Sequence, residues 1–196
     1  MGRIVVTEFI SLDGVIEDPG GAEDFKYGGW SFEFDRGDAG NKFKLDETMG
    51  SAALLLGRVT YEGFAKAWPQ RDGEFAEKFN TMPKYVVSST VDGSEWTNTT
   101  VLDGDVPAAV RKVRDEVDGD IVVHGSGQLV QTLLENDLVD RWHLMVFPVV
   151  LGAGQRLFGE TTVKKPLKLV STETVGDGVT IAVYEPSSPG ETSPAS

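Results

Sequence analysis

Two segments of the chain share one pattern, in which a short apolar run ends at a glycine and a stretch with helical spacing follows. Residues 54–60 read Leu-Leu-Leu-Gly-Arg-Val-Thr, and residues 121–127 read Ile-Val-Val-His-Gly-Ser-Gly. A helix start offers unpaired N–H groups and the positive end of the helix dipole, and glycine lets a ligand approach the backbone. The pattern therefore indicates two phosphate-binding turns at strand ends, with ordinary strand-to-helix turns as the alternative.

Basic and hydroxyl side chains stand close to these turns. Arg58 begins the first helical stretch, and Ser88, Ser89 and Thr90 end a third apolar run. An arginine matches a phosphate group with two parallel hydrogen bonds, so this set is suited to the 2′-phosphate that distinguishes NADPH from NADH. The alternatives are a surface salt bridge for Arg58 and turn hydrogen bonds for the hydroxyls.

Other patterns that carry chemistry are absent or weak. The chain has no cysteine, and His124 and His143 lack the spacing of a zinc site. Ser126 lacks the glycines two residues to either side that a nucleophile elbow requires, and no Gly-x-Gly-x-x-Gly fingerprint occurs. The aromatic residues Trp30, Phe34 and Trp68 are candidates for the wall of an apolar substrate slot, although core packing explains them equally.

Composition narrows the classes of partner. The 196 residues carry a net charge of −13, which disfavours nucleic acids and anionic membranes as partners. There is no apolar run of membrane-spanning length and no secretory leader pattern, so we expect a cytoplasmic protein that acts on a small molecule.

The elements that must position these residues alternate along the chain. Apolar runs predict strands at 4–12, 52–56, 84–88, 121–123, 142–150, 167–170 and 179–184. Helical spacing is found over 41–50, where Phe43, Leu45 and Met49 are the apolar positions, and after Arg58, Glu74, Val106 and Gly127. This order predicts an α/β fold with a mostly parallel central sheet, flanking helices and an antiparallel hairpin at one edge. We expect one domain over 1–185 and a disordered tail over 186–196.

Several motifs occur in a recognisable order. They are Ser11-Leu12-Asp13-Gly14, Gly57-Arg58-Val59-Thr60-Tyr61-Glu62, Val86-Val87-Ser88-Ser89, Gly125-Ser126-Gly127 and Pro148-Val149-Val150-Leu151-Gly152-Ala153-Gly154. Together they resemble the dihydrofolate-reductase-like family, in the branch of the reductase half of the riboflavin-biosynthesis deaminase–reductase. The resemblance covers residues 4 to about 185 and implies a three-layer fold, transfer of hydride from NADPH to a small heterocyclic, pterin-like or aminosugar-derived substrate, and a homodimer.

The resemblance also implies roles for individual residues. Those that would contact the cofactor are Gly14, Gly57, Arg58, Val59, Thr60, Ser88, Ser89, Gly125, Ser126, Gly127, Gln128 and Leu129. Asp13 would lie beside the nicotinamide. The folate enzymes place a carboxylate on the helix after the flap, for which Asp46 and Glu47 are the nearest matches, with Asp35 behind them. We take Asp13 and Asp46 as the catalytic candidates.

The chain departs from the family pattern in two places. The folate enzymes have paired glycines where this chain has Gly125-Ser126, and the helix carboxylate has no firm match. The missing proton donor and the absence of an obvious substrate-phosphate site leave a second hypothesis open, a nucleotide-cofactor-binding or sensory protein without turnover.

Overall fold

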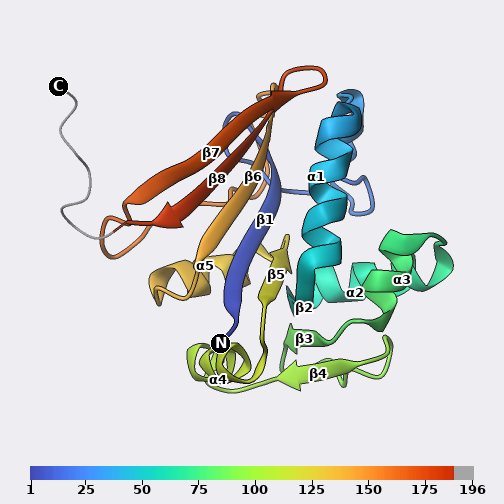
Figure 1. Cartoon of the computed structure of the whole chain (residues 1–196), viewed down its shortest axis with the longest axis vertical. Coiled ribbons are helices and arrows are strands. Elements are labelled where there is room, and N and C mark those ends of the chain that lie inside the picture. Colours follow the sequence, from blue (N-terminus) through green and yellow to red (C-terminus); the bar gives the residue numbers. More distant parts are fainter. Residues whose placement is uncertain (188–196) are drawn as a thin grey trace.

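The computed structural model describes residues 1–187, and its centre is one sheet of eight strands (Figure 1). Across the sheet the strands lie in the order β4-β3-β2-β5-β1-β6-β8-β7. Their bounds are β1 (Arg3–Ser11), β2 (Ser51–Gly57), β3 (Lys84–Val87), β4 (Thr99–Leu102), β5 (Asp120–His124), β6 (Arg141–Phe147), β7 (Leu167–Val175) and β8 (Val179–Pro186). All neighbouring pairs from β4 to β6 are parallel, whereas β8 runs antiparallel to both β6 and β7.

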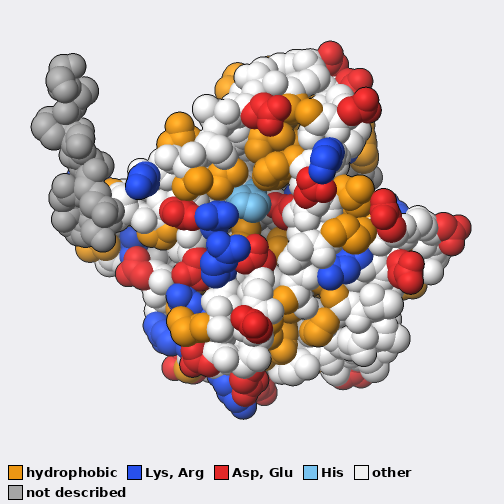
Figure 2. Space-filling model, in the orientation of Figure 1, with side chains coloured by type: hydrophobic (Ala, Val, Ile, Leu, Met, Phe, Trp, Pro, Cys, Tyr) orange, Lys and Arg blue, Asp and Glu red, His pale blue; other side chains and the backbone are white. Residues whose placement is uncertain are grey.

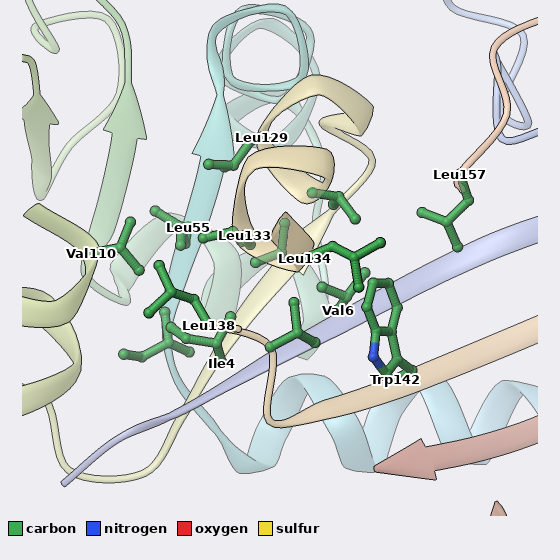
Figure 3. Packing of buried hydrophobic residues seen from close by; sticks show 14 of the residues in the cluster. Ile4, Val6, Leu55, Val110, Leu129, Leu133, Leu134, Leu138, Trp142 and Leu157 are labelled. Carbon is green, nitrogen blue, oxygen red and sulfur yellow. The ribbon is translucent and has the colours of Figure 1, made fainter. Parts of the chain in front are cut away.

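Helices cover both faces of this sheet, because strands buried on two faces need apolar layers on each side. One face carries α4 (Val106–Glu116) and α5 (Gly127–Glu135), whose apolar side chains pack on Ile4 and Val6 of β1 and on Leu55 of β2 (Figure 3). The other face carries α1 (Gly37–Gly50), α2 (Arg58–Ala67) and α3 (Glu74–Thr81). Two short 3-10 turns, η1 (Trp30–Glu33) and η2 (Trp68–Gln70), complete the list of helices in the described part.

The predicted α/β class, the mostly parallel sheet and the antiparallel edge hairpin are confirmed. The sequence did not predict β4, since only two of its four residues are apolar. The predicted tail begins at Pro186, which ends β8, and its residues 188–196 lie outside the described part. Within residues 1–187, no helix combines the length and the apolar character that a membrane crossing requires.

Helix α1 differs from its prediction in start and in buried face. It begins at Gly37 rather than at residue 41, and the side it buries carries Gly40, Lys44 and Thr48. These positions are spaced by four residues, so they form one stripe along the helix. A helix that buries a lysine against the sheet needs polar partners there, and Thr7 of β1 and Glu47 of α1 itself supply them.

The turn between β7 and β8 is fastened to the start of α1. The Asp177 amide donates to the Asp35 carbonyl at 2.8 Å, and the Asp35 amide donates to the Asp177 carboxylate at 2.9 Å. Gly176 lies so close that a Cβ atom on it would stand 1.9 Å from the Asp35 carbonyl oxygen. In Figure 1 this turn and the beginning of α1 lie together at the top of the molecule. We call the contact between Asp35 and the Gly176–Asp177 turn the hairpin latch.

Candidate functional site

The two glycine turns meet at the carboxyl ends of neighbouring strands. Strands β2 and β5 are adjacent, and the Gly57 amide donates to the Ser126 hydroxyl at 2.9 Å. The Ser126 amide in turn donates to the Thr60 hydroxyl at 3.1 Å, and the Ser126 hydroxyl donates to the His124 carbonyl at 2.9 Å. These bonds join the starts of α2 and α5 into one structure, which we call the double turn.

The backbone of the double turn leaves little room for larger side chains. Gly125 and Ser126 both have left-handed conformations, with φ of +53° and +59°. A Cβ atom on Gly125 would lie 3.0 Å from the Thr60 hydroxyl oxygen, and one on Gly127 would lie 2.6 Å from the Gln155 side chain. The amides of the first turns of α2 and α5 precede the helical hydrogen-bond ladder, so they are free to bind an anion. They belong to Arg58, Val59, Thr60, Gly127, Gln128 and Leu129.

Arg58 and Ser88 lie side by side at the ends of β2 and β3. Gly57 pairs with Val87 in the sheet, so the residues that follow each of them emerge at the same level. The Arg58 guanidinium contacts the Glu62 carboxylate at 3.0 Å, and both side chains are partly exposed. An exposed pair of this kind contributes only about 0.3–0.5 kcal/mol, so a phosphate group can replace Glu62 as the partner. The Ser88 hydroxyl accepts from the Thr90 and Val91 amides, and Ser89 is exposed.

Asp13 fastens the segment after β6 to the end of β1. Its carboxylate accepts hydrogen bonds from the Ser11 hydroxyl and from the amides of Leu151 and Gly152, at 2.7, 3.1 and 2.9 Å. These bonds, the one from Ser11 first, lower the pKa of Asp13 to about 2. At neutral pH the group is therefore ionised and has no proton to give. Its catalytic assignment stays a prediction, and its contacts are those of a positioning residue. Gly14 follows with φ of +83° and open space around it.

Glu8 lies beneath the double turn and was not among the candidates from the sequence. Its side chain is buried on β1 beside the Gly125 amide, and Oε1 has no hydrogen-bond partner within residues 1–187. Burial raises the pKa of Glu8 well above its usual value, against the opposing effects of the Lys44 charge and the Gly125 amide. The raised pKa of Glu8 favours its uncharged form under a turn suited to anions, where an ionised carboxylate would repel phosphate.

Exchange of Glu8 for glutamine is expected to change how stability depends on pH. The folded protein keeps a proton on Glu8 that the unfolded chain releases above its usual pKa of 4.5, so the native protein loses stability as the pH rises above that value. Glutamine does not titrate, so Glu8→Gln is expected to remove this loss. The loss amounts to at most about 1.4 kcal/mol of unfolding free energy per pH unit. Urea unfolding at pH 5 and pH 8 measures it. Glu173→Gln on the exposed strand β7 is the control, and equal pH slopes in Glu8→Gln and the native protein would contradict the prediction.

A second group of buried polar side chains lies between α1 and the sheet. The Glu47 carboxylate contacts the Lys44 ammonium and lies 2.6 Å from Nδ1 of His143, and Lys44 also donates to the Thr7 hydroxyl at 2.7 Å. Burial opposes the ionisation of Glu47, but the Lys44 charge and the His143 hydrogen bond hold its pKa below the usual range. We call these four residues the α1 polar cluster. Asp46, the catalytic candidate beside it, is exposed and pairs with Lys42.

The α1 polar cluster lies next to the double turn, because Thr7 pairs in the sheet with His124, the residue that precedes Gly125. Thr7 lies between His124 on β5 and His143 on β6. Burial, with a further contribution from the Lys44 charge, lowers the pKa of His124 to about 3, so this imidazole is neutral. On the face shown in Figure 2 a histidine is visible near the centre, with Lys and Arg side chains beside it and hydrophobic side chains above it.

The three aromatic candidates do not form one wall. Trp30 is buried and contacts the edge of Phe147, which Phe34 also approaches. Trp68 lies in a different cluster, stacked on Phe75 and Phe79. The structure therefore brings Trp30 and Phe34 together near the ends of β1 and β6, while Trp68 lies apart from them.

Sequence reasoning missed Glu8, His143 and Gln155 as members of the site. Gln155 could have been found, because it directly follows the glycine-rich motif over residues 148–154. No sequence pattern identifies Glu8 or His143 as site residues, since both lie within strands and only the sheet register shows what surrounds them.

The family model described as the RibD C-terminal domain matches residues 3–181. The protein YyaP of Bacillus subtilis (strain 168) is 29% identical over 195 residues, with 93% of this chain and 94% of YyaP covered.

Two solved structures share the fold. A putative riboflavin biosynthesis protein from Shewanella sp. PV-4 superimposes with a TM-score of 0.75 at 22% identity, covering 95% of this chain and 99% of that one. The dihydrofolate reductase of Enterococcus faecalis, complexed with NADP(H) and RAB-propyl, gives a TM-score of 0.61 at 15% identity, covering 95% and 97%.

Proposed function

Because the chain belongs to the RibD C-terminal domain family, we propose that it is a reductase that binds NADPH across the double turn and reduces a small molecule. The observation that carries this proposal is the hydrogen-bonded junction of two helix starts, Gly57 to Ser126 and Ser126 to Thr60. A dinucleotide has several phosphate groups, and the junction offers two sets of free amides close to a guanidinium.

The residues present fit this cofactor. Gly125 and Gly127 let the start of α5 lie close to Thr60 and Gln155, since Cβ atoms there would stand 3.0 Å and 2.6 Å from those side chains, and this close packing keeps the two helix starts together. The free amides would hold the pyrophosphate, and Arg58 with Ser88 and Ser89 would hold the 2′-phosphate. The raised pKa of Glu8 supports the arrangement, because it favours an uncharged acid beneath the phosphates. When bound, NADPH supplies the hydride.

Other residues of the chain position the reacting end of the site. Asp13 holds the segment that includes Leu151 and Gly152 against the end of β1, which keeps Gln155 over the start of α5. In the α1 polar cluster the Glu47 carboxylate lies 2.6 Å from Nδ1 of His143, and the Lys44 charge and this contact hold the pKa of Glu47 below its usual range against the effect of burial. A dimer remains a prediction from the family resemblance.

Replacement of Arg58 by alanine tests the cofactor assignment. A bidentate contact between arginine and phosphate contributes about 1.5–3 kcal/mol, so Arg58→Ala is expected to weaken NADPH binding by about 10- to 100-fold. NADH lacks the 2′-phosphate and is expected to change less than about threefold. Quenching of protein fluorescence on titration measures both affinities. Arg111→Ala on the exposed side of α4 is the control. An equal loss of affinity for NADPH and NADH in Arg58→Ala would contradict the assignment.

A nucleotide-binding protein without turnover is the second candidate. It is favoured by one observation, that Asp13 is ionised and Asp46 is exposed, so neither has the surroundings of a proton donor. Oxidation of NADPH in the presence of pterins, quinones or carbonyl compounds decides between the two. Turnover with any of them supports the reductase, whereas NADPH binding without turnover supports the alternative.

A further inference from the structure

Glu8 is a buried acid that stands where the double turn leaves the sheet. Only 5% of its surface is exposed, and Oε1 has no hydrogen-bond partner in the part of the chain that the structure describes. Strand β5 ends at His124, which pairs with Thr7 of β1. Glu8, the next residue of β1, therefore lies beside the Gly125 amide of the double turn.

The face of β1 that carries Glu8 is apolar on both sides of it. Side chains alternate along a strand, so Glu8 shares its face with Val6 and Ile10. Both are buried in the cluster that also contains Leu129 and Val130 of α5. A carboxylate in such surroundings needs hydrogen-bond donors in place of water, and across residues 1–187 Oε1 has none. The packing around Glu8 therefore disfavours its ionised form.

The charged groups around Glu8 do not neutralise it. The positive charge that acts on it is Lys44, whose ammonium already contacts the Glu47 carboxylate. Burial raises the pKa of Glu8 most and the Glu47 charge adds to this effect, against the Lys44 charge and the Gly125 amide. His124, the last residue of β5, has a pKa of about 3 and is uncharged at neutral pH.

The free amides at the start of α5 connect the charge of Glu8 to ligand binding. They belong to Gly127, Gln128 and Leu129, and they are suited to a phosphate group. A phosphate held there brings negative charge close to a buried carboxyl group, where little water screens the repulsion. The added charge favours the protonated carboxyl group, and by the same coupling an ionised Glu8 weakens binding of the phosphate.

We propose that the binding of NADPH to the double turn is coupled to protonation of Glu8, so that the complex keeps one proton on this carboxyl group. The inference rests on the proposed function, because NADPH supplies the phosphates. When Glu8 is ionised in the free protein, a buffer acid gives up one proton on binding and the O–H bond of Glu8 forms. NADPH affinity therefore falls as the pH rises through the titration of Glu8, by at most about tenfold per pH unit.

Isothermal calorimetry with NADPH tests this coupling in the native protein and in Glu8→Gln. Titrations are made from pH 6 to pH 9, each in two buffers that differ in heat of ionisation. Glutamine keeps the size of the side chain but does not titrate. Between pH 6 and pH 9 we expect the native affinity to fall by about tenfold or more relative to Glu8→Gln, with uptake of up to one proton per NADPH in the native protein alone. The 2′-phosphate titrates equally in both experiments, so its effect cancels.

Glu173→Gln is the control, because it removes an exposed acid on β7 and is expected to keep the native pH profile. Parallel profiles of the native protein and Glu8→Gln would overturn the proposal, as would the same change in Glu173→Gln. If Glu8→Gln does not fold, proton uptake by the native protein decides, because binding to arginine makes the 2′-phosphate release protons rather than take them up. Parallel profiles leave the proposed function intact, whereas a native protein that binds no NADPH at any pH contradicts the proposed function itself.

Discussion

Replacement of Glu47 by glutamine is expected to lower the free energy of unfolding by about 3–5 kcal/mol at neutral pH. The Lys44 ammonium would then remain in the α1 polar cluster without a counter-charge, and its side chain is only 10% exposed. Removing one partner of a buried ion pair costs far more than the pair itself contributes, because the remaining charge stays away from water. Urea unfolding followed by circular dichroism measures the change.

The pH dependence and a neighbouring residue provide the checks. Glu47 has a lowered pKa in the folded protein, so its stabilising effect is present above the usual value of 4.5 and is lost as the pH falls. The difference between Glu47→Gln and the native protein should therefore shrink below pH 4.5. Asp46→Asn on the exposed side of α1 is the control, with an expected change below about 0.5 kcal/mol. Equal stabilities of the two variants would show that the cluster is not the anchor of α1.

Gly176→Ala is expected to destabilise the protein by about 3–5 kcal/mol. Gly176 has φ of +49°, and its new Cβ would stand 1.9 Å from the Asp35 carbonyl oxygen and 2.6 Å from the Arg36 carbonyl carbon. Both are backbone atoms, so neither can turn aside, and the hairpin latch must open. Thermal unfolding measures the loss, and faster hydrogen exchange at the Asp177 amide would show that the latch is the part affected.

The same turn contains its own control. Gly178 has φ of +89°, but nothing lies within 4 Å of its added Cβ. Gly178→Ala therefore isolates the conformational cost of alanine in the left-handed region, about 1 kcal/mol. Losses of the same size in both variants would mean that the contact with Asp35 adds nothing to stability.

The sequence predicts most of the fold because the strands that form its centre are short, continuous apolar runs. Residues 52–56 and 121–123 could be recognised in this way, and the glycines that follow them ended the strands where the structure ends them. Strand β4 could not be recognised, since Thr99 and Thr100 resemble the turn residues before them. Helix α1 was expected to bury an apolar face. The burial of Lys44 could not be predicted, because it depends on contacts with Glu47 and with Thr7 of a distant strand.

The sequence predicts the parts of the site that local patterns define, but not the contacts between residues far apart in the chain. A glycine after a strand indicates a turn suited to phosphate, so Gly57 and Gly125 were found, but 69 residues separate Gly57 from the Ser126 hydroxyl that it contacts. His143 and Glu47 are 96 residues apart, and nothing near either one indicates the other.

The most direct test of the NADPH site is the backbone amide spectrum of the protein during titration with NADPH. We expect the largest shifts at the amides in the first turns of α2 and α5, among them Arg58, Thr60, Gly127 and Gln128, and a smaller response at Arg58 when NADH replaces NADPH. Shifts confined to another surface, or a spectrum unchanged at millimolar NADPH, would contradict the account.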